Sequence, residues 1–202
     1  MIRIAVLVSG GGTNLQALIN AENAGKIPHG KISLVLASND KAYALERAKK
    51  ADIPAIAVKR KDYASQEDFD QALIASLHAY KIDMIILAGY LSILGASVID
   101  AYRDRMINIH PSLIPSFCGK GFYGLHVHEA ALARGVKVTG ATVHYVNEIP
   151  DGGKIILQKA VEIQEDDTPE ILQKRVMEQA EWILLPKAAE MVAEKIAEEK
   201  AK

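Results

Sequence analysis

Short apolar runs rich in β-branched residues alternate with helix-like segments along the first half of the chain. The runs lie at residues 2–8, 32–36, 55–58, 84–87 and 106–109. Strands that alternate with helices pack as a parallel sheet with right-handed crossovers, because each helix returns the chain to the same edge of the sheet. The alternation therefore predicts an α/β fold with a doubly wound, mostly parallel sheet covered by helices on both faces.

The pattern changes after residue 110. Residues 111–124 are rich in Pro and Gly, and a short helix-like segment follows at 128–134. Two strand-like segments, 139–146 and 154–163, are then joined by the turn sequence Pro150-Asp151-Gly152-Gly153. A tight turn between two strands is typical of a hairpin, so we expect antiparallel strands to extend the sheet in the C-terminal part.

Helix starts are marked by capping residues. Ser65-Gln66-Glu67-Asp68 has the pattern of a capping box, and Thr168-Pro169-Glu170 places a cap, a proline and an acid at the start of the last helix. We expect the end of that helix, residues 187–202, to be solvated and frayed. The chain has no repeat, linker or low-complexity segment, so residues 1–202 are expected to form a single domain.

Composition argues against several function classes. The 24 basic and 25 acidic residues leave a net charge of −1, which provides no global field for a polyanion, so nucleic acid is not expected as a partner. The longest apolar stretch, residues 84–99, is interrupted by Gly and Ser and is shorter than the roughly 18 residues of a membrane helix. The single cysteine, Cys118, is typical of a reducing compartment, and we expect a cytoplasmic protein without a membrane anchor.

The segment Ser9-Gly10-Gly11-Gly12-Thr13-Asn14 lies between the first expected strand and a helix. Backbone N–H groups and the helix dipole at such a turn bind anions, typically phosphate. A dinucleotide fingerprint would need Gly or Ala at position 15, where this chain has Leu15, and a Walker loop would need Gly-Lys-Ser/Thr. The turn therefore predicts phosphate binding, with a purely structural strand-to-helix turn as the alternative.

Asn108 and His110 lie two residues apart at the end of an expected strand, so their side chains share one face of the sheet. An amide beside an imidazole suits a reaction that develops negative charge on a carbonyl oxygen, because both groups can donate hydrogen bonds to it when the histidine is protonated. Taken alone, this signal is weak, because a histidine before a proline is more often a loop residue with a satisfied hydrogen bond than a catalyst.

The sequence from Asn108 to Pro115, together with the glycine-rich turn, resembles the folate-dependent formyltransferases of purine synthesis. The match spans nearly the whole chain, and its other stretches are Leu87-Ala88-Gly89-Tyr90, residues 140–146, Asp151-Gly152-Gly153 and residues 155–158. The resemblance implies a Rossmann-like formyltransferase fold. It also implies that a formyl group passes from 10-formyltetrahydrofolate to the amine of phosphoribosyl glycinamide, in purine biosynthesis, with no metal.

The resemblance assigns roles to individual residues. Asn108 and His110 would bind the formyl oxygen and stabilise a tetrahedral intermediate. Asp151 would pair with His110, keep it protonated and assist proton transfer. The residues that match the family's contacts to the phosphoribosyl substrate, or lie one helical turn from such a contact, are Gly12, Thr13, Asn14, Glu178 and Glu181.

The implied folate site is an apolar slot edged by polar backbone groups. Its expected residues are Gln66, Leu91, Ser92, Ile93, Leu94, Asn108, Asn147, Glu148, Ile149, Pro150 and Asp151. Some family members carry arginine where this chain has Gln66 and Ser92, so we expect weak capture of the carboxylate tail of the folate. Lys120 either replaces the lost positive charge or is simply solvated.

Other functions remain open at this stage. A nicotinamide-dependent oxidoreductase would also use a glycine-rich turn after its first strand, and a phosphate-sensing module would need neither His110 nor Asp151. Formyltransferases acting on initiator tRNA and formyltetrahydrofolate hydrolases usually carry an additional domain, so the length of this chain favours the purine pathway. His144 either borders the pocket or packs beside it, and both a monomer and a homodimer are compatible with the sequence.

Overall fold

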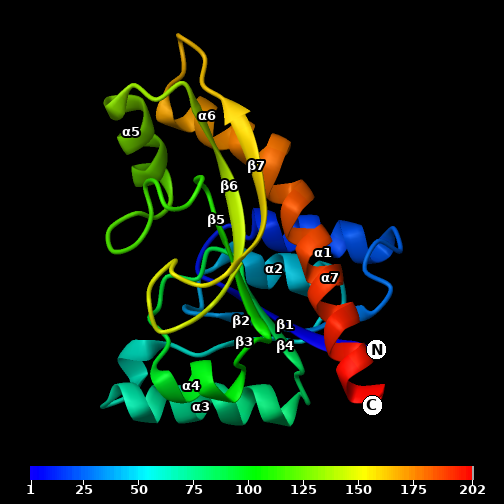
Figure 1. Cartoon of the computed structure of the whole chain (residues 1–202). Coiled ribbons are helices and arrows are strands. Elements are labelled where there is room, and N and C mark those ends of the chain that lie inside the picture. Colours follow the sequence, from blue (N-terminus) through cyan, green and yellow to red (C-terminus); the bar gives the residue numbers. More distant parts are fainter. Residues whose placement is uncertain (202) are drawn as a thin grey trace.

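The computed structural model describes residues 1–201 (Figure 1). Its centre is a seven-stranded sheet with the strand order β3-β2-β1-β4-β5-β6-β7. Neighbouring strands from β3 to β5 are parallel, whereas β6 and β7 are antiparallel to their neighbours. The strands are β1 (Ile2–Val8), β2 (Gly30–Ala37), β3 (Ala55–Ala57), β4 (Met84–Leu87), β5 (Met106–His110), β6 (Val138–Tyr145) and β7 (Ile155–Glu162). The predicted fold class is confirmed.

Helices cover both faces of the sheet. In Figure 1, α3 and α4 lie on one face and α1, α2 and α7 on the other, while α5 and α6 flank the antiparallel end. The helices are α1 (Thr13–Asn23), α2 (Tyr43–Lys50), η1 (Arg60–Asp62), α3 (Gln66–Ala79), α4 (Ala96–Ala101), α5 (Leu125–Arg134), α6 (Pro169–Val176), the π-helical turn η2 (Met177–Glu181) and α7 (Trp182–Ala201).

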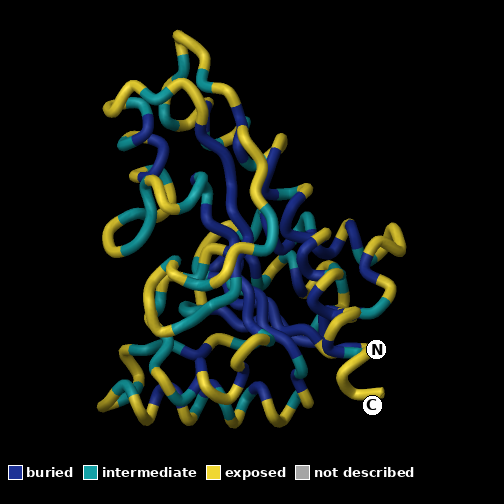
Figure 2. The backbone as a smooth tube through the Cα atoms, viewed as in Figure 1, coloured by how far each residue is buried: buried dark blue, intermediate teal, exposed yellow. Residues whose placement is uncertain are grey.

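The core is divided by the sheet into two apolar clusters. Successive side chains of a strand point to opposite faces, so Val6 and Val8 of β1 pack with α1 and α7, whereas Leu7 packs with α3. Figure 2 shows the central strands buried and the outer faces of α3 and α4 exposed. Burial on both faces explains why the parallel strands are apolar runs rather than alternating ones.

The predicted helix starts are confirmed. Ser65 and Asp68 form a reciprocal capping box at α3, with the Asp68 N–H donating to the Ser65 hydroxyl at 3.0 Å. Thr168 caps α6 and accepts a hydrogen bond from the Ile171 N–H at 3.3 Å. The expectation that residues 187–202 are solvated is wrong for one face of α7, because Val192 packs in the core there. Residue 202 lies outside the described range.

The sheet brings three loops to one edge. The glycine-rich turn follows β1, residues 88–95 follow β4, and residues 111–124 follow β5, so all three leave the carboxyl ends of parallel strands. β1 and β4 are neighbours at the point where the strand order reverses, which is where open α/β sheets bind their ligands. Within residues 1–201, no helix is both long and apolar enough to cross a bilayer.

Candidate active site

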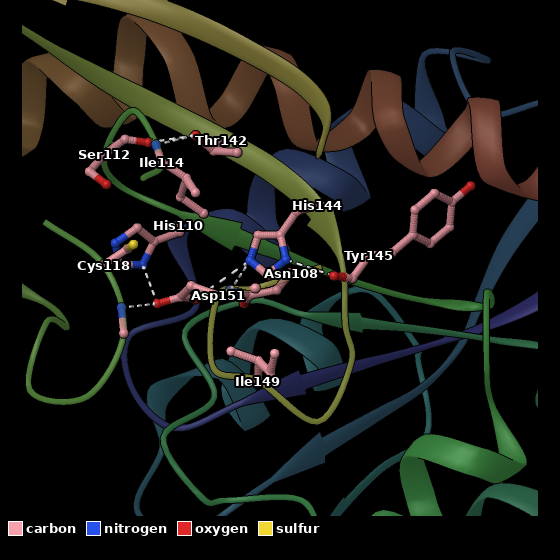
Figure 3. Close-up of polar contacts among 12 residues, drawn as sticks. Asn108, His110, Ser112, Ile114, Cys118, Thr142, His144, Tyr145, Ile149 and Asp151 are labelled. Atoms are coloured by element: carbon pink, nitrogen blue, oxygen red, sulfur yellow. Dashed lines mark hydrogen bonds and ion pairs between the residues drawn. The ribbon is translucent and has the colours of Figure 1, made fainter. Parts of the chain in front are cut away.

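Asn108 and His110 lie at the carboxyl end of β5, beside the antiparallel strand β6. The register places Asn108 opposite His144 and His110 opposite Thr142. The loop between β6 and β7 carries Asp151 back over this strand end, and Figure 3 shows its carboxylate between the two imidazole rings. The three residues predicted to be catalytic are therefore brought together, and His144 joins them.

The Asp151 carboxylate contacts four groups. Its Oδ2 accepts a hydrogen bond from the Gly119 N–H at 2.7 Å and lies 3.6 Å from Nδ1 of His110. Its Oδ1 lies 3.4 Å from Nδ2 of Asn108 and 3.5 Å from Nε2 of His144. The short contact is to the backbone, and the three side-chain contacts are long, so the carboxylate is anchored by the loop after β5.

Burial alone would raise the pKa of Asp151. The contact with His144, the charge of His110 and the Gly119 N–H outweigh burial and hold the pKa below its ordinary value. The carboxylate is therefore ionised at neutral pH. The backbone of Asp151 itself is left-handed, with φ of 55°. Two residues later, a Cβ at Gly153 would lie only 1.6 Å from the Tyr145 carbonyl oxygen. The turn after Asp151 thus requires glycine at position 153.

His110 is buried, and its two ring nitrogens face different partners. Nε2 lies 2.8 Å from the Phe117 carbonyl oxygen, and a carbonyl can only accept, so Nε2 carries a hydrogen. In the neutral ring Nδ1 is then an unprotonated base that faces Asp151. Burial lowers the pKa of His110 below its ordinary value, although Asp151 and the Phe117 carbonyl oppose that shift. Asp151 thus favours the protonated ring, as expected, but burial has the larger effect on the pKa of His110.

Asn108 and His144 share one hydrogen bond. Nδ1 of His144 donates to the Tyr145 carbonyl at 2.7 Å, so in the neutral ring Nε2 is left as an acceptor. Nδ2 of Asn108 lies 3.2 Å from that Nε2 and donates to it. The second hydrogen on Nδ2 has only the 3.4 Å contact with Asp151, so it is the donor most easily redirected to a ligand oxygen.

The glycine-rich turn is braced by α2. Gly12 has φ of 72°, and a Cβ there would lie 2.7 Å from the Cβ of Ala44. Arg47 donates from Nε to the Gly11 carbonyl at 2.7 Å, and the Ala44 N–H donates to the Gly10 carbonyl at 3.2 Å. In the described chain, no side chain caps α1. Its first N–H groups are thus free to bind an anion, and phosphate binding at this turn stays a prediction.

Glu181 lies beside this turn. It is buried, and its Oε2 accepts a hydrogen bond from Nδ2 of Asn14 at 2.6 Å. Burial raises the pKa of Glu181 to about 7, although the Asn14 hydrogen bond opposes the shift. Glu178 is instead on the solvated side of η2, 3.9 Å from Lys174. The structure therefore joins Thr13, Asn14 and Glu181 in one place and leaves Glu178 at the surface.

The two expected folate segments expose apolar side chains at the same edge of the sheet. Leu91 is 61% exposed, Ile93 is 80% exposed and Ile149 is 65% exposed, which is unusual for aliphatic residues. Gln66 Nε2 donates to the Ile93 carbonyl at 3.1 Å, so the start of α3 holds the segment after β4. Arg60, which was not among the predicted site residues, donates from Nε to Oε1 of Gln66 at 3.1 Å and supplies a positive charge there.

Three further groups lie near the cluster. Within the part of the chain that is described, both ring nitrogens of the buried His128 lack a hydrogen-bond partner, and burial together with the charge of His110 lowers its pKa to about 4. The Cys118 thiol donates to the Pro115 carbonyl at 3.3 Å, and burial and Asp151 raise its pKa, which disfavours a thiolate nucleophile. Lys120 is exposed.

Among residues 1–201, no cluster of three or more His, Cys, Asp or Glu side chains is arranged to hold a metal ion.

Comparison with known proteins places this site in a family. The profile described as "Formyl transferase" matches residues 2–188. The phosphoribosylglycinamide formyltransferase of Haemophilus influenzae is 41% identical over 179 residues, which cover 89% of this chain and 82% of that protein. The trifunctional purine biosynthetic protein adenosine-3 of Drosophila melanogaster is 41% identical over 94% of this chain.

The chain spans only 14–18% of the trifunctional proteins that it matches. Among solved structures, glycinamide ribonucleotide transformylase 1 of Symbiobacterium toebii superposes with a TM-score of 0.90 and is 42% identical, covering 96% of this chain and 89% of that one. The family profile covers most of the chain, and the similarity in sequence and in fold extends over the same residues. The chain therefore belongs to the formyltransferase family.

Proposed function

We propose that this formyltransferase transfers the formyl group of 10-formyltetrahydrofolate to the amine of phosphoribosyl glycinamide, with Asn108, His110 and Asp151 as its catalytic residues. The observation that carries the proposal is the convergence of an amide, an imidazole and a carboxylate, from Asn108, His110 and Asp151, at one strand end. The glycine-rich turn, with free N–H groups for a phosphate, opens on the same edge of the sheet.

The chemistry begins with attack of the amine nitrogen on the formyl carbon, which forms a C–N bond and moves an electron pair onto the formyl oxygen. Asn108 donates its weakly used Nδ2 hydrogen to that oxygen, in place of the 3.4 Å contact with Asp151. The attacking nitrogen must also lose a proton. Nδ1 of the neutral His110 accepts it, and the Asp151 carboxylate stabilises the imidazolium that results.

The tetrahedral intermediate then collapses and breaks the bond between the formyl carbon and N10 of the folate. The electron pair of that bond stays on N10, which takes a proton from His110. The histidine returns to its neutral form, and no net proton is gained or lost by the protein. His110 thus stabilises the oxyanion only while it carries the proton, which is the period in which the negative charge exists.

The phosphoribosyl substrate is held at the other end of the site. We assign its phosphate to the backbone N–H groups at Gly12, Thr13 and Asn14, and its ribose hydroxyls to Glu181, whose carboxyl is already oriented by Asn14. Glu178, one helical turn earlier and exposed, is assigned only an outer contact. At these residues the phosphate would lie near the positive end of α1, which supports the assignment.

The folate lies against the segments after β4 and β6. The exposed side chains of Leu91, Ile93 and Ile149 cover its ring system, and the remaining contacts come from Ser92, Leu94, Asn147, Glu148 and Pro150. Gln66 holds the first segment in place, and Arg60 beside it meets the carboxylate tail. We also propose that the protein is cytoplasmic and that residues 1–202 act as one domain.

The test is an absorbance assay with purified protein, phosphoribosyl glycinamide and 10-formyltetrahydrofolate. Turnover with both substrates is expected, and its dependence on each one separates transfer to the amine from hydrolysis of the folate. Asn108→Ala should reduce turnover by roughly 10²–10³-fold, the loss expected for one oxyanion donor. Turnover that does not depend on the glycinamide substrate, or full activity of a folded Asn108→Ala protein, contradicts the proposal.

A further inference from the structure

A cleft of about 720 Å³ lies between α1 and α7, away from the catalytic residues. Its volume is in the range of small-molecule sites, about 300–1,000 Å³. None of Asn108, His110 and Asp151 lines it, and only Thr13 belongs to both the cleft and the glycine-rich turn. It follows α1 from Thr13 to Ala21, about 12 Å at the rise of a helix, and Lys26 lines it beyond the end of α1.

The cleft exists because short side chains on α1 face α7. Ala17 and Ala21 are four residues apart, so their methyl groups lie one above the other on the same side of the helix. The walls of α7 are larger and apolar, and they are formed by Trp182, Ile183, Pro186 and Met191. Two of these side chains, Ile183 and Met191, are 48% and 44% exposed, so the apolar lining is accessible from solvent.

The rim of the cleft is positively charged. Lys26, Arg47 and Lys187 line it, and among residues 1–201 neither lysine takes part in an ion pair. The acidic residue on the lining is Glu190, whose Oε1 lies 2.5 Å from Nδ1 of His29. An apolar interior with cations at its rim, on a chain with a net charge of −1, is complementary to a small molecule that is apolar and carries an acidic group.

We propose that the α1–α7 cleft is a second binding site, for a small aromatic anion with a carboxylate, sulfonate or phosphate on an apolar ring system. The rings contact Trp182 and Pro186, and the acidic group pairs with Lys187 and Arg47. Arg47 also donates to the Gly11 carbonyl, so an anion that attracts its guanidinium group weakens the brace of the glycine-rich turn. Occupancy of the cleft therefore lowers the affinity for the phosphoribosyl substrate. This coupling, unlike the site itself, rests on the proposed function.

The site is tested with anilinonaphthalene sulfonate, an aromatic anion that fluoresces when bound in an apolar cleft. Ala17→Trp fills the cleft from α1, and Lys187→Glu reverses a charge on its rim. Each variant should raise the dissociation constant of the probe by about tenfold or more, which corresponds to the loss of one good contact. Lys49→Glu makes the same charge change on α2, outside the lining, and should leave binding unchanged. Equal binding to all four proteins would overturn the proposal.

The coupling is tested by kinetics and by its reciprocal. The probe should raise KM for phosphoribosyl glycinamide by roughly fivefold, and saturating glycinamide substrate should weaken the probe by the same factor. Lys187→Glu should keep basal turnover and lose this response. Probe binding without an effect on KM would retain the site and remove the coupling. A sedimentation shift showing that Ala17→Trp breaks a dimer would instead make the cleft an interface between two copies and overturn the small-molecule site.

Discussion

Replacing Asp151 with Asn removes the charge that stabilises a protonated His110 and leaves the size of the side chain almost unchanged. The carboxylate lies 3.6 Å from Nδ1 of His110. At that distance, two unit charges attract by about 5 kcal/mol with an effective dielectric constant near 20. Losing this attraction entirely in the transition state would slow turnover by between about 10³- and 10⁴-fold. Solvent at the sheet edge screens the two charges and makes the loss smaller. We therefore expect kcat to fall by roughly 10²–10⁴-fold.

The fold should survive this substitution. Asn tolerates the left-handed backbone at position 151, and its amide oxygen can still accept from the Gly119 N–H. KM for both substrates should change little, since the charge acts mainly after the amine attacks. Because Asp151 raises the pKa of His110 against burial, its loss should lower that pKa further and move the acidic limb of the kcat/KM profile to lower pH. Near-normal turnover of the folded variant, or an unchanged His110 titration by NMR, would refute the assignment.

Three other substitutions test the remaining parts of the site. Gly12→Val introduces a Cβ about 2.7 Å from Ala44 in left-handed backbone and should raise KM for the phosphoribosyl substrate while leaving the folate KM unchanged; equal losses would indicate misfolding instead. Burial raises the pKa of Glu181 to about 7, so the unfolded chain loses its proton at lower pH than the folded protein does. The free energy of unfolding should therefore fall by about 3 kcal/mol as pH rises from about 4.5 to about 7. Glu181→Gln should remove that loss, and urea unfolding at both ends of the range would show it; an equal pH dependence in both proteins counts against the burial effect. Ser92→Arg should tighten folate binding in calorimetry, and unchanged affinity would mean that Arg60 already meets the tail or that the tail stays in solvent.

The strand pattern was readable because the parallel strands are buried on both faces. Residues 2–8 and 84–87 were predicted with the bounds that the structure has, and the hairpin of β6 and β7 differs by one residue at each end. The π-helical turn at Met177–Glu181 was not predicted, because one wider turn inside a helix changes no residue type and only shifts the phase of the pattern. In the folded protein it is Glu181, and not Glu178, that contacts Asn14 of the glycine-rich turn.

The catalytic residues were only partly readable. Asn108 and His110 share a face because side chains alternate along a strand, and that follows from spacing alone. His144 could not be assigned, since its place beside Asn108 depends on the antiparallel register of β6. The contacts from the Phe117 carbonyl and the Gly119 N–H come from the backbone, which leaves no signature in the sequence. The lowered pKa of His110 depends on burial, which only the folded protein shows.

The backbone contact to His110 decides how its imidazole works. In a Ser-His-Asp triad the carboxylate holds the ring nitrogen that faces away from the reaction, and the other nitrogen exchanges protons with the substrate. Here the Phe117 carbonyl fixes Nε2, while the carboxylate of Asp151 lies on the side of Nδ1, the atom left to accept a proton. Asp151 therefore acts on the charge of the histidine rather than on its tautomer. The loop after β5 supplies the orientation, and a change in that loop should alter turnover even where no catalytic side chain is touched.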